Sequence, residues 1–277
     1  MNKHKLNNLP SKLISEIDNV INIKADVKTM KMAIELMDLT SLGYDDNESS
    51  IKEICSKAYN KYGKVAAICV YKNFIKDVIK ETKHDIGIAT VISFPEGKDD
   101  IEKIINDTSS AINDGANEID IVFNWKDFLY GGEQGIEKAR NALILCNSVC
   151  KGGAKMKVIL ESGKFNDYNI LKEASILSLN SGADFLKTST GKAENTCGAS
   201  PEAASIFLEA IKETKSHSGI KLSGGIKTPS QACAYIKLAQ NMMGNKWVNK
   251  DNFRIGASGL LDVLIQSILD LESQTGN

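Results

Sequence analysis

The sequence has few of the features that mark membrane proteins or nucleic-acid-binding proteins. No apolar run approaches the roughly 18 residues that a membrane-spanning helix needs, and segment 1–24 is too polar for a signal-peptide core. The 34 basic and 35 acidic residues leave a formal net charge of -1, and there is no dense Lys/Arg tract. We therefore expect a chain that binds neither a membrane nor nucleic acid.

Cysteine and histidine are also scarce and scattered. The six cysteines include no CxxC pair, and the closest two, Cys146 and Cys150, have the i,i+4 spacing of a helix. The three histidines lie far apart and form neither an HxH nor an HExxH motif. We expect reduced thiols, a cytoplasmic protein and a site without a metal ion.

What is present is typical of an ordinary globular protein. The 277 residues are 42% hydrophobic and 25% charged, with 21 glycines and only 4 prolines, which argues against disorder, collagen and low complexity. A chain of this length can form two small domains, but it can equally form one (β/α)₈ barrel.

Short β-branched runs alternate along the chain with longer segments of helical periodicity, which predicts parallel βαβ units. Eight such runs over about 220 residues favour a closed (β/α)₈ TIM barrel. The rival, an open doubly wound sheet, usually has fewer strands and often a glycine fingerprint after its first strand, which is absent here. The eight predicted strands are 36–40, 66–71, 87–94, 118–123, 157–161, 184–188, 219–223 and 253–257.

Helix boundaries follow from local signals. Ser200 and Thr228 each precede a proline and are expected N-caps, with the proline in the first helical position. Gly115 and Gly182 are expected to end their helices in the left-handed conformation.

The N-terminal residues fit no βα unit. Leu13, Ile14, Ile17 and Val20 predict an extra helix that packs against the outside or bottom of the barrel. We therefore expect a helical extension over 1–30 and a single barrel domain over 31–277.

Three predicted strands contain a charged residue where a buried parallel strand should be apolar: Asp120, Lys187 and Lys221. Lys187 and Lys221 are 34 residues apart, about one βα unit, so they belong on adjacent strands. Asp120 precedes Lys187 by 67 residues, about two units. All three should point into one half of the barrel.

Two explanations fit these buried charges. Asp120 could neutralise one lysine in a purely structural ion pair. Alternatively, one ammonium lowers the pKa of the other lysine below its usual ~10.4, and the neutral amine forms a Schiff base with a carbonyl substrate. Asp120 would then transfer protons, directly or through a water molecule, as in a class I aldolase.

Glycine turns follow the last two predicted strands, at 223–226 and 256–259. The loops after strands seven and eight of such barrels often bind phosphate through backbone N–H groups. Lys192, after Thr190 and Gly191, could add a positive charge there, or could be an ordinary solvated lysine.

These residues together resemble the deoxyribose-phosphate aldolases, class I aldolases with a (β/α)₈ fold. The resemblance extends from about Ile34 to Leu264, and its most specific part is the KTSTG segment with the downstream K-x-S-G-G. The segments that carry it are LMDLT (36–40), AICVY (67–71), SFPEG (93–97), EIDIVF (118–123), FLKTSTGK (185–192), KLSGGI (221–226) and RIGAS (254–258).

The resemblance implies reversible cleavage of 2-deoxy-D-ribose 5-phosphate to acetaldehyde and D-glyceraldehyde 3-phosphate, without a cofactor. Lys187 matches the Schiff-base lysine, Lys221 the second lysine that tunes it, and Asp120 the carboxylate of the proton relay. The expected substrate-binding residues are Asp38, Thr190, Gly191, Lys192, Gly224, Gly225, Gly256 and Ser258. Asp38 could equally cap the turn that follows it.

The sequence departs from the family in two places that concern the site. It ends in LESQTGN without the C-terminal tyrosine that some members use in proton transfer, so turnover is expected to be slower unless Asp120 and water suffice. Gly259 stands where some members have a second serine near the phosphate.

Two other functions stay open. One is a related class I lyase or transaldolase that acts on another sugar phosphate, and the other is a sugar-phosphate-binding protein without catalysis. Members of the family often form dimers, so the resemblance implies a homodimer as one assembly.

Overall fold

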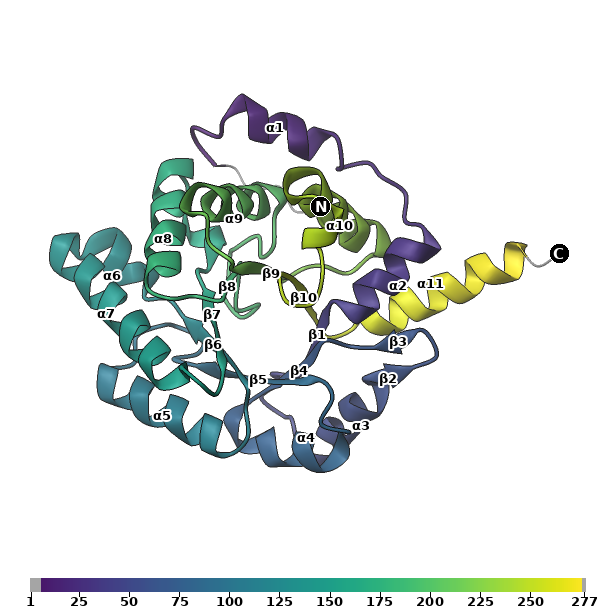
Figure 1. Ribbon diagram of the computed structural model, residues 1–277, viewed down its shortest axis with the longest axis horizontal. Coiled ribbons are helices and arrows are strands. Elements are labelled where there is room, and N and C mark those ends of the chain that lie inside the picture. The colour runs from purple at the N-terminus through teal and green to yellow at the C-terminus, as the bar shows by residue number, and fades with distance from the viewer. Residues whose placement is uncertain (1–5, 276–277) are drawn as a thin grey trace.

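A computed structural model describes residues 6–275, and residues 1–5 of the predicted N-terminal extension lie outside them. Eight parallel strands close into a barrel in the order β1-β10-β9-β8-β7-β6-β5-β4 (Figure 1). The predicted (β/α)₈ barrel is confirmed, and each predicted strand overlaps one observed strand. The strands are β1 (Met37–Thr40), β4 (Ala67–Val70), β5 (Gly87–Ile92), β6 (Glu118–Val122), β7 (Lys155–Ile159), β8 (Phe185–Lys187), β9 (Gly219–Ser223) and β10 (Phe253–Ala257).

Helices surround the barrel in a ring (Figure 1). They are α3 (Glu48–Lys57), α4 (Ile75–Glu81), α5 (Ile101–Asn113), the short α6 (Trp125–Tyr130), α7 (Gly132–Cys150), α8 (Tyr168–Asn180), α9 (Pro201–Thr214), α10 (Pro229–Met243) and α11 (Leu260–Thr275). A small antiparallel pair, β2 (Tyr59–Asn60) and β3 (Gly63–Lys64), lies between α3 and β4 in the chain. None of the helices within residues 6–275 has the length and apolar character that crossing a membrane requires.

The predicted helix boundaries are confirmed. The side chain of Ser200 accepts a hydrogen bond from the Ala203 N–H at the start of α9, and Thr228 forms a capping box with Gln231 at the start of α10. Gly115 and Gly182 follow α5 and α8 with φ of 107° and 95°, which only glycine adopts at little cost.

The N-terminal extension contains α1 (Ser11–Asp18), which packs on the outside of the barrel against α9 and α10 (Figure 1). Leu13, Ile17 and Val20 are buried as expected, whereas Ile14 is 43% exposed. The next helix, α2 (Val27–Glu35), begins before residue 30, the predicted end of the extension, and continues beyond it. It packs against α10 and α11.

The hydrophobic core lies mainly between the outward faces of the strands and the helices. All six cysteines are free thiols, five of them buried. Inside the barrel, part of the volume that apolar side chains usually fill holds charged side chains instead, among them Asp38, Asp120, Lys157 and Lys221, each 0% exposed. Burying a charge is costly unless it is paired, so the arrangement of these side chains needs a chemical explanation.

Candidate active site

The strand register brings the predicted charged residues together. Lys187 of β8 lies opposite Lys221 of β9, and Lys221 lies opposite Arg254 of β10. Asp120 of β6 is separated from Lys187 by strand β7, where its opposite residue is Lys157. The predicted spacing of one βα unit between the lysines and two between Asp120 and Lys187 is therefore confirmed.

Both predicted lysines contact one oxygen of the predicted aspartate. The Nζ atoms of Lys187 and Lys221 each lie 2.7 Å from Asp120 Oδ2, and Lys187 is only 3% exposed. Two amines that share one carboxylate oxygen are close enough for the charge of one to act on the other.

The ion pairs extend beyond these three residues. Lys157 Nζ lies 2.9 Å from Asp38 Oδ2 and 3.1 Å from Asp120 Oδ1, and it also contacts Glu118. Asp38 Oδ2 is 2.6 Å from Lys221 Nζ. The Arg254 guanidinium lies 2.5 Å from Asp38 Oδ1 and 2.8 Å from Glu118 Oε1. We call these seven side chains the barrel ion network: Asp38, Glu118, Asp120, Lys157, Lys187, Lys221 and Arg254.

The environment separates the pKa values of the two lysines. Burial lowers the pKa of Lys187; Asp120 opposes this shift and the Lys221 ammonium adds to it, so that the net direction is downward. Burial also lowers the pKa of Lys221, but the carboxylates of Asp120 and Asp38 outweigh burial and hold that pKa well above its usual value. Lys221 therefore holds its proton more tightly, and Lys187 is the lysine that gives one up more readily.

The Asp120 carboxylate stays ionised. Burial alone would raise its pKa, but Lys157, Lys187 and Lys221 overcome this effect and hold the pKa far below the usual value. The pKa of Asp38 is also held well below its usual value, because Lys157, Lys221 and Arg254 outweigh burial. These carboxylates accept hydrogen bonds and stabilise the neighbouring positive charges.

The charges of the barrel ion network balance when Lys187 is neutral. With every group ionised, the network holds four cations and three carboxylates. Loss of the Lys187 proton leaves three cations and three carboxylates, which lowers the cost of burial. A purely structural network has no need of the fourth cation.

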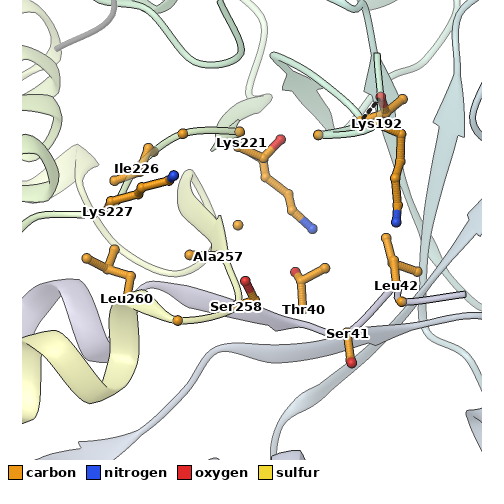
Figure 2. A pocket seen from close by; sticks show the side chains of 18 of the residues that line it. Thr40, Ser41, Leu42, Lys192, Lys221, Ile226, Lys227, Ala257, Ser258 and Leu260 are labelled. Atoms are coloured by element: carbon orange, nitrogen blue, oxygen red, sulfur yellow. Dashed lines mark hydrogen bonds between the residues drawn. The ribbon is translucent and has the colours of Figure 1, made fainter. Parts of the chain in front are cut away.

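A cavity of about 720 Å³ opens above the network, at the carboxyl ends of the strands where barrels of this type carry their active sites. Figure 2 shows Lys192, Lys221 and Lys227 around this cavity, on different parts of its wall. Lys187 also lines it, and the only carboxylate among the described lining residues is that of Asp46. The Asp46 carboxylate already accepts hydrogen bonds from Ser41 Oγ and the Gly43 N–H. Because lysines outnumber carboxylates in the lining, the cavity favours an anionic ligand.

Glycines from the turns after β9 and β10 also line the cavity. Gly224, after β9, has φ of 90°, and a Cβ atom there would lie 2.7 Å from Ser189 Oγ. A Cβ atom on Gly256 would lie 3.0 Å from Lys221 Cε, so glycine leaves room for that side chain. Ser258 is exposed just before α11, whose N-terminus offers unpaired N–H groups that suit a phosphate.

Nine of the eleven predicted site residues line the cavity: Lys187, Thr190, Gly191, Lys192, Lys221, Gly224, Gly225, Gly256 and Ser258. Asp120 lies behind Lys187 and Lys221, in contact with both. Asp38 does not line the cavity and caps no turn; its carboxylate belongs to the barrel ion network, beneath the wall. Its expected role in substrate binding stays a prediction, and the structure adds a place among the counterions.

Sequence reasoning missed Lys157, Glu118 and Arg254 of the network and Lys227 of the cavity wall. The first three stood inside or at the start of predicted strands, so the rule that flagged Asp120 also applied to them. Lys227 follows the glycine turn after β9, and no strand pattern marks it.

Comparison with known proteins is consistent with this geometry. Residues 32–261 match the sequence profile of the DeoC/LacD family of aldolases. A Toxoplasma gondii structure provisionally named deoxyribose-phosphate aldolase superposes with a TM-score of 0.80 at 20% identity, covering 88% of this chain and 95% of that one. One from Coccidioides immitis, also provisionally named, gives 0.75 at 24% identity, with 96% and 99% covered.

A third structure, the deoxyribose phosphate aldolase of Aeropyrum pernix described as a tetramer, gives a TM-score of 0.67 at 23% identity and covers 94% of this chain and 98% of that one. At these identities the three structures establish the shared fold. The family profile covers most of the chain, which therefore belongs to the DeoC/LacD family of aldolases.

Proposed function

We propose that this DeoC/LacD family aldolase is a class I enzyme that reversibly cleaves 2-deoxy-D-ribose 5-phosphate to acetaldehyde and D-glyceraldehyde 3-phosphate, in the breakdown of deoxynucleosides. The observation that carries the proposal is Lys187, a buried lysine with a lowered pKa that shares one carboxylate oxygen with a second, protonated lysine. This arrangement supplies the neutral amine that Schiff-base chemistry needs.

The reaction begins at the Lys187 amine. Its lone pair attacks the aldehyde carbon C1 of the open-chain sugar, and loss of water leaves a protonated imine. The imine carries a positive charge on the nitrogen that Asp120 contacts, so the ionised carboxylate stabilises it.

The imine then acts as the electron sink for carbon–carbon cleavage. A base removes the proton of the C3 hydroxyl, the C2–C3 bond breaks, and its electron pair forms an enamine on C2. C3 leaves as the aldehyde carbon of glyceraldehyde 3-phosphate. Protonation of C2 and hydrolysis of the imine release acetaldehyde and restore the amine.

Asp120 is the proposed proton carrier for these steps, through a water molecule where the distance requires one. Its pKa, far below the usual range, keeps it ionised and therefore able to accept a hydrogen bond or a proton, and it gives up any accepted proton at once. Lys221 holds a fixed positive charge beside the reacting nitrogen and keeps the Lys187 pKa low.

The proposed phosphate position lies between the glycine turns, the N-terminus of α11 and the ammonium groups of Lys192 and Lys227. Their N–H groups and positive charges suit a phosphate dianion. The phosphate would then hold the sugar with C1 toward Lys187.

The test is a coupled assay with 2-deoxy-D-ribose 5-phosphate that measures acetaldehyde and glyceraldehyde 3-phosphate separately. We expect equal amounts of the two products, and no measurable activity for Lys187→Ala with an unchanged circular dichroism spectrum. Normal turnover by a folded Lys187→Ala variant would contradict the proposal.

A donor panel separates the related lyases. Condensation of glyceraldehyde 3-phosphate with acetaldehyde supports the proposal, whereas condensation with dihydroxyacetone and not with acetaldehyde would assign another class I aldolase. Binding of sugar phosphates in calorimetry without turnover on either donor would instead indicate a binding protein.

A further inference from the structure

Glu161 is a buried carboxylate outside the barrel ion network, two residues after the end of β7. It is 1% exposed, its backbone has a left-handed φ of 51°, and its Oε1 atom has no hydrogen-bond partner among residues 6–275. A left-handed non-glycine residue and an unsatisfied buried acceptor each cost free energy. Costs of this kind are expected where a residue serves the site rather than stability alone.

The other carboxylate oxygen of Glu161 holds Thr190. Glu161 Oε2 accepts hydrogen bonds from the Thr190 N–H at 3.0 Å and from the Thr190 hydroxyl at 2.6 Å. The threonine hydroxyl is therefore the donor in the second of these bonds. The lone pairs of that hydroxyl remain available, and Thr190 Oγ1 accepts the Lys192 N–H at 3.1 Å.

This chain of hydrogen bonds ends at the cavity, although Glu161 does not line it. Thr190, Gly191 and Lys192 form part of the wall, and the Lys192 ammonium lies 4.4 Å from the centre of the Tyr44 ring. Glu161 thus fixes the backbone of the turn at Thr190–Lys192. The Lys192 side chain makes a cation–π contact with Tyr44, in the loop after β1.

We propose that Glu161 is a positioning residue that acts through Thr190 to hold the Gly191–Lys192 turn where it binds the phosphorylated end of the substrate. This inference rests on the proposed function, because it takes a sugar phosphate as the ligand of the cavity. Glu161 has no part in imine chemistry, since its contacts run to the turn and not to Lys187.

The experiment compares kcat and KM of Glu161→Ala and Glu161→Gln with those of the wild type, using 2-deoxy-D-ribose 5-phosphate. Loss of two hydrogen bonds to the turn in Glu161→Ala should raise KM about tenfold or more while kcat changes less than about threefold. Glutamine keeps an acceptor oxygen for Thr190, so Glu161→Gln should restore KM to within about threefold of wild type.

A control residue lies at the amino ends of β7 and β8, whereas Glu161 and Thr190 follow the carboxyl ends of these strands. Asp184 Oδ2 accepts the Met156 N–H at 2.7 Å and so also links β7 to the segment entering β8, but far from the cavity wall. Asp184→Ala should lower the melting temperature and leave the KM for the phosphorylated sugar unchanged.

Unphosphorylated 2-deoxy-D-ribose separates positioning from general damage. The kcat/KM of Glu161→Ala for this sugar should stay within about threefold of wild type, because the sugar lacks the group that the turn binds. An equal loss on both sugars, or a Glu161→Ala variant with wild-type KM, would overturn the inference.

Thr190→Val, which is nearly isosteric and removes the hydroxyl in the middle of the chain, tests the same link if Glu161→Ala fails to fold. It should also raise KM for the phosphorylated sugar, and an unchanged KM would overturn the inference. Failure of the proposed function looks different: the wild type itself would then show no turnover and no borohydride-trapped adduct with acetaldehyde.

Discussion

Lys187 and Lys221 occupy opposite positions on neighbouring strands and contact the same oxygen, yet their pKa values shift in opposite directions. The difference comes from their counterions. Lys221 is paired with Asp38 as well as with Asp120, whereas within residues 6–275 Lys187 pairs only with Asp120. The second carboxylate favours the proton on Lys221 and leaves Lys187 as the proposed nucleophile.

The pH profile of Lys221→Leu tests this division. Removal of the neighbouring ammonium should raise the pKa of Lys187, so the acidic limb of the kcat/KM profile should move to higher pH by about one to three units. Activity at neutral pH should fall about 100-fold and partly recover at alkaline pH. A variant with reduced activity but an unmoved acidic limb would show that Lys221 does not tune Lys187.

Lys157 provides a second test, with a control on the same strand. Lys157→Met leaves buried carboxylates short of a partner and should lower the free energy of unfolding by about 3–5 kcal/mol. Lys155, two residues earlier, pairs with Asp251 at the surface, where the two side chains are 40% and 63% exposed. Lys155→Met should cost less than about 1 kcal/mol in urea unfolding. Equal effects of the two substitutions would contradict the importance of the network.

At this scale the sequence revealed the proposed reacting residues better than their ion-pair partners. Asp120, Lys187 and Lys221 stood out because a charge interrupted an apolar strand. The role of Asp38 was not visible, because its partners Lys157, Lys221 and Arg254 come from three other strands across or around the barrel. The spacing of residues in the sequence indicates which strands are neighbours in the sheet, but not which side chains meet inside the barrel.

The turns after β9 and β10 line the cavity and form part of the proposed phosphate position. The Gly224 carbonyl accepts the Ala199 N–H at 2.9 Å, so the turn after β9 is docked on the loop that precedes α9. The backbone of this turn is therefore held in place before any ligand arrives, which favours binding through its N–H groups.

Gly224→Ala tests the importance of this turn. A methyl group there is strained at φ of 90° and lies 2.7 Å from Ser189 Oγ, so the turn must shift. We expect KM for 2-deoxy-D-ribose 5-phosphate to rise about tenfold or more, because the N–H groups lose their alignment. Gly259 lines the same cavity with no atom within 4 Å of an added Cβ, so Gly259→Ala should change KM less than about twofold. A similar KM for both variants would argue against the turn as a phosphate site.

Elements were the part of the structure that the sequence predicted most completely. Proline after Ser200 and Thr228 marked two helix starts, and β-branched runs marked all eight barrel strands. The small β2–β3 pair was not predicted, because its two-residue strands are too short for any periodicity to show.

For the whole molecule, the barrel ion network couples folding to pH. Asp38 and Asp120 have lower pKa values in the folded chain than the usual 3.8, so the unfolded chain binds protons first as the pH falls. Their contribution to stability is fully present above about pH 4 and is lost progressively below it.

Urea unfolding between pH 7 and pH 2.5 measures this coupling. Below about pH 4 the free energy of unfolding should fall with a slope of up to about 2.7 kcal/mol per pH unit, from two carboxylates that stay ionised in the folded state. Asp38→Asn removes one of them and should make the slope about half as steep. A wild-type free energy that is constant over this acidic range would contradict the depressed pKa values.

The central claim is that Lys187 is the nucleophilic amine, and borohydride trapping with acetaldehyde tests it most directly. The protein is treated with acetaldehyde and sodium borohydride, and the product is examined by intact mass and peptide mapping. We predict a single ethyl group on Lys187, with none on Lys221. No adduct on the folded protein would contradict imine chemistry, and an adduct on Lys221 instead would contradict the assignment of the two lysines.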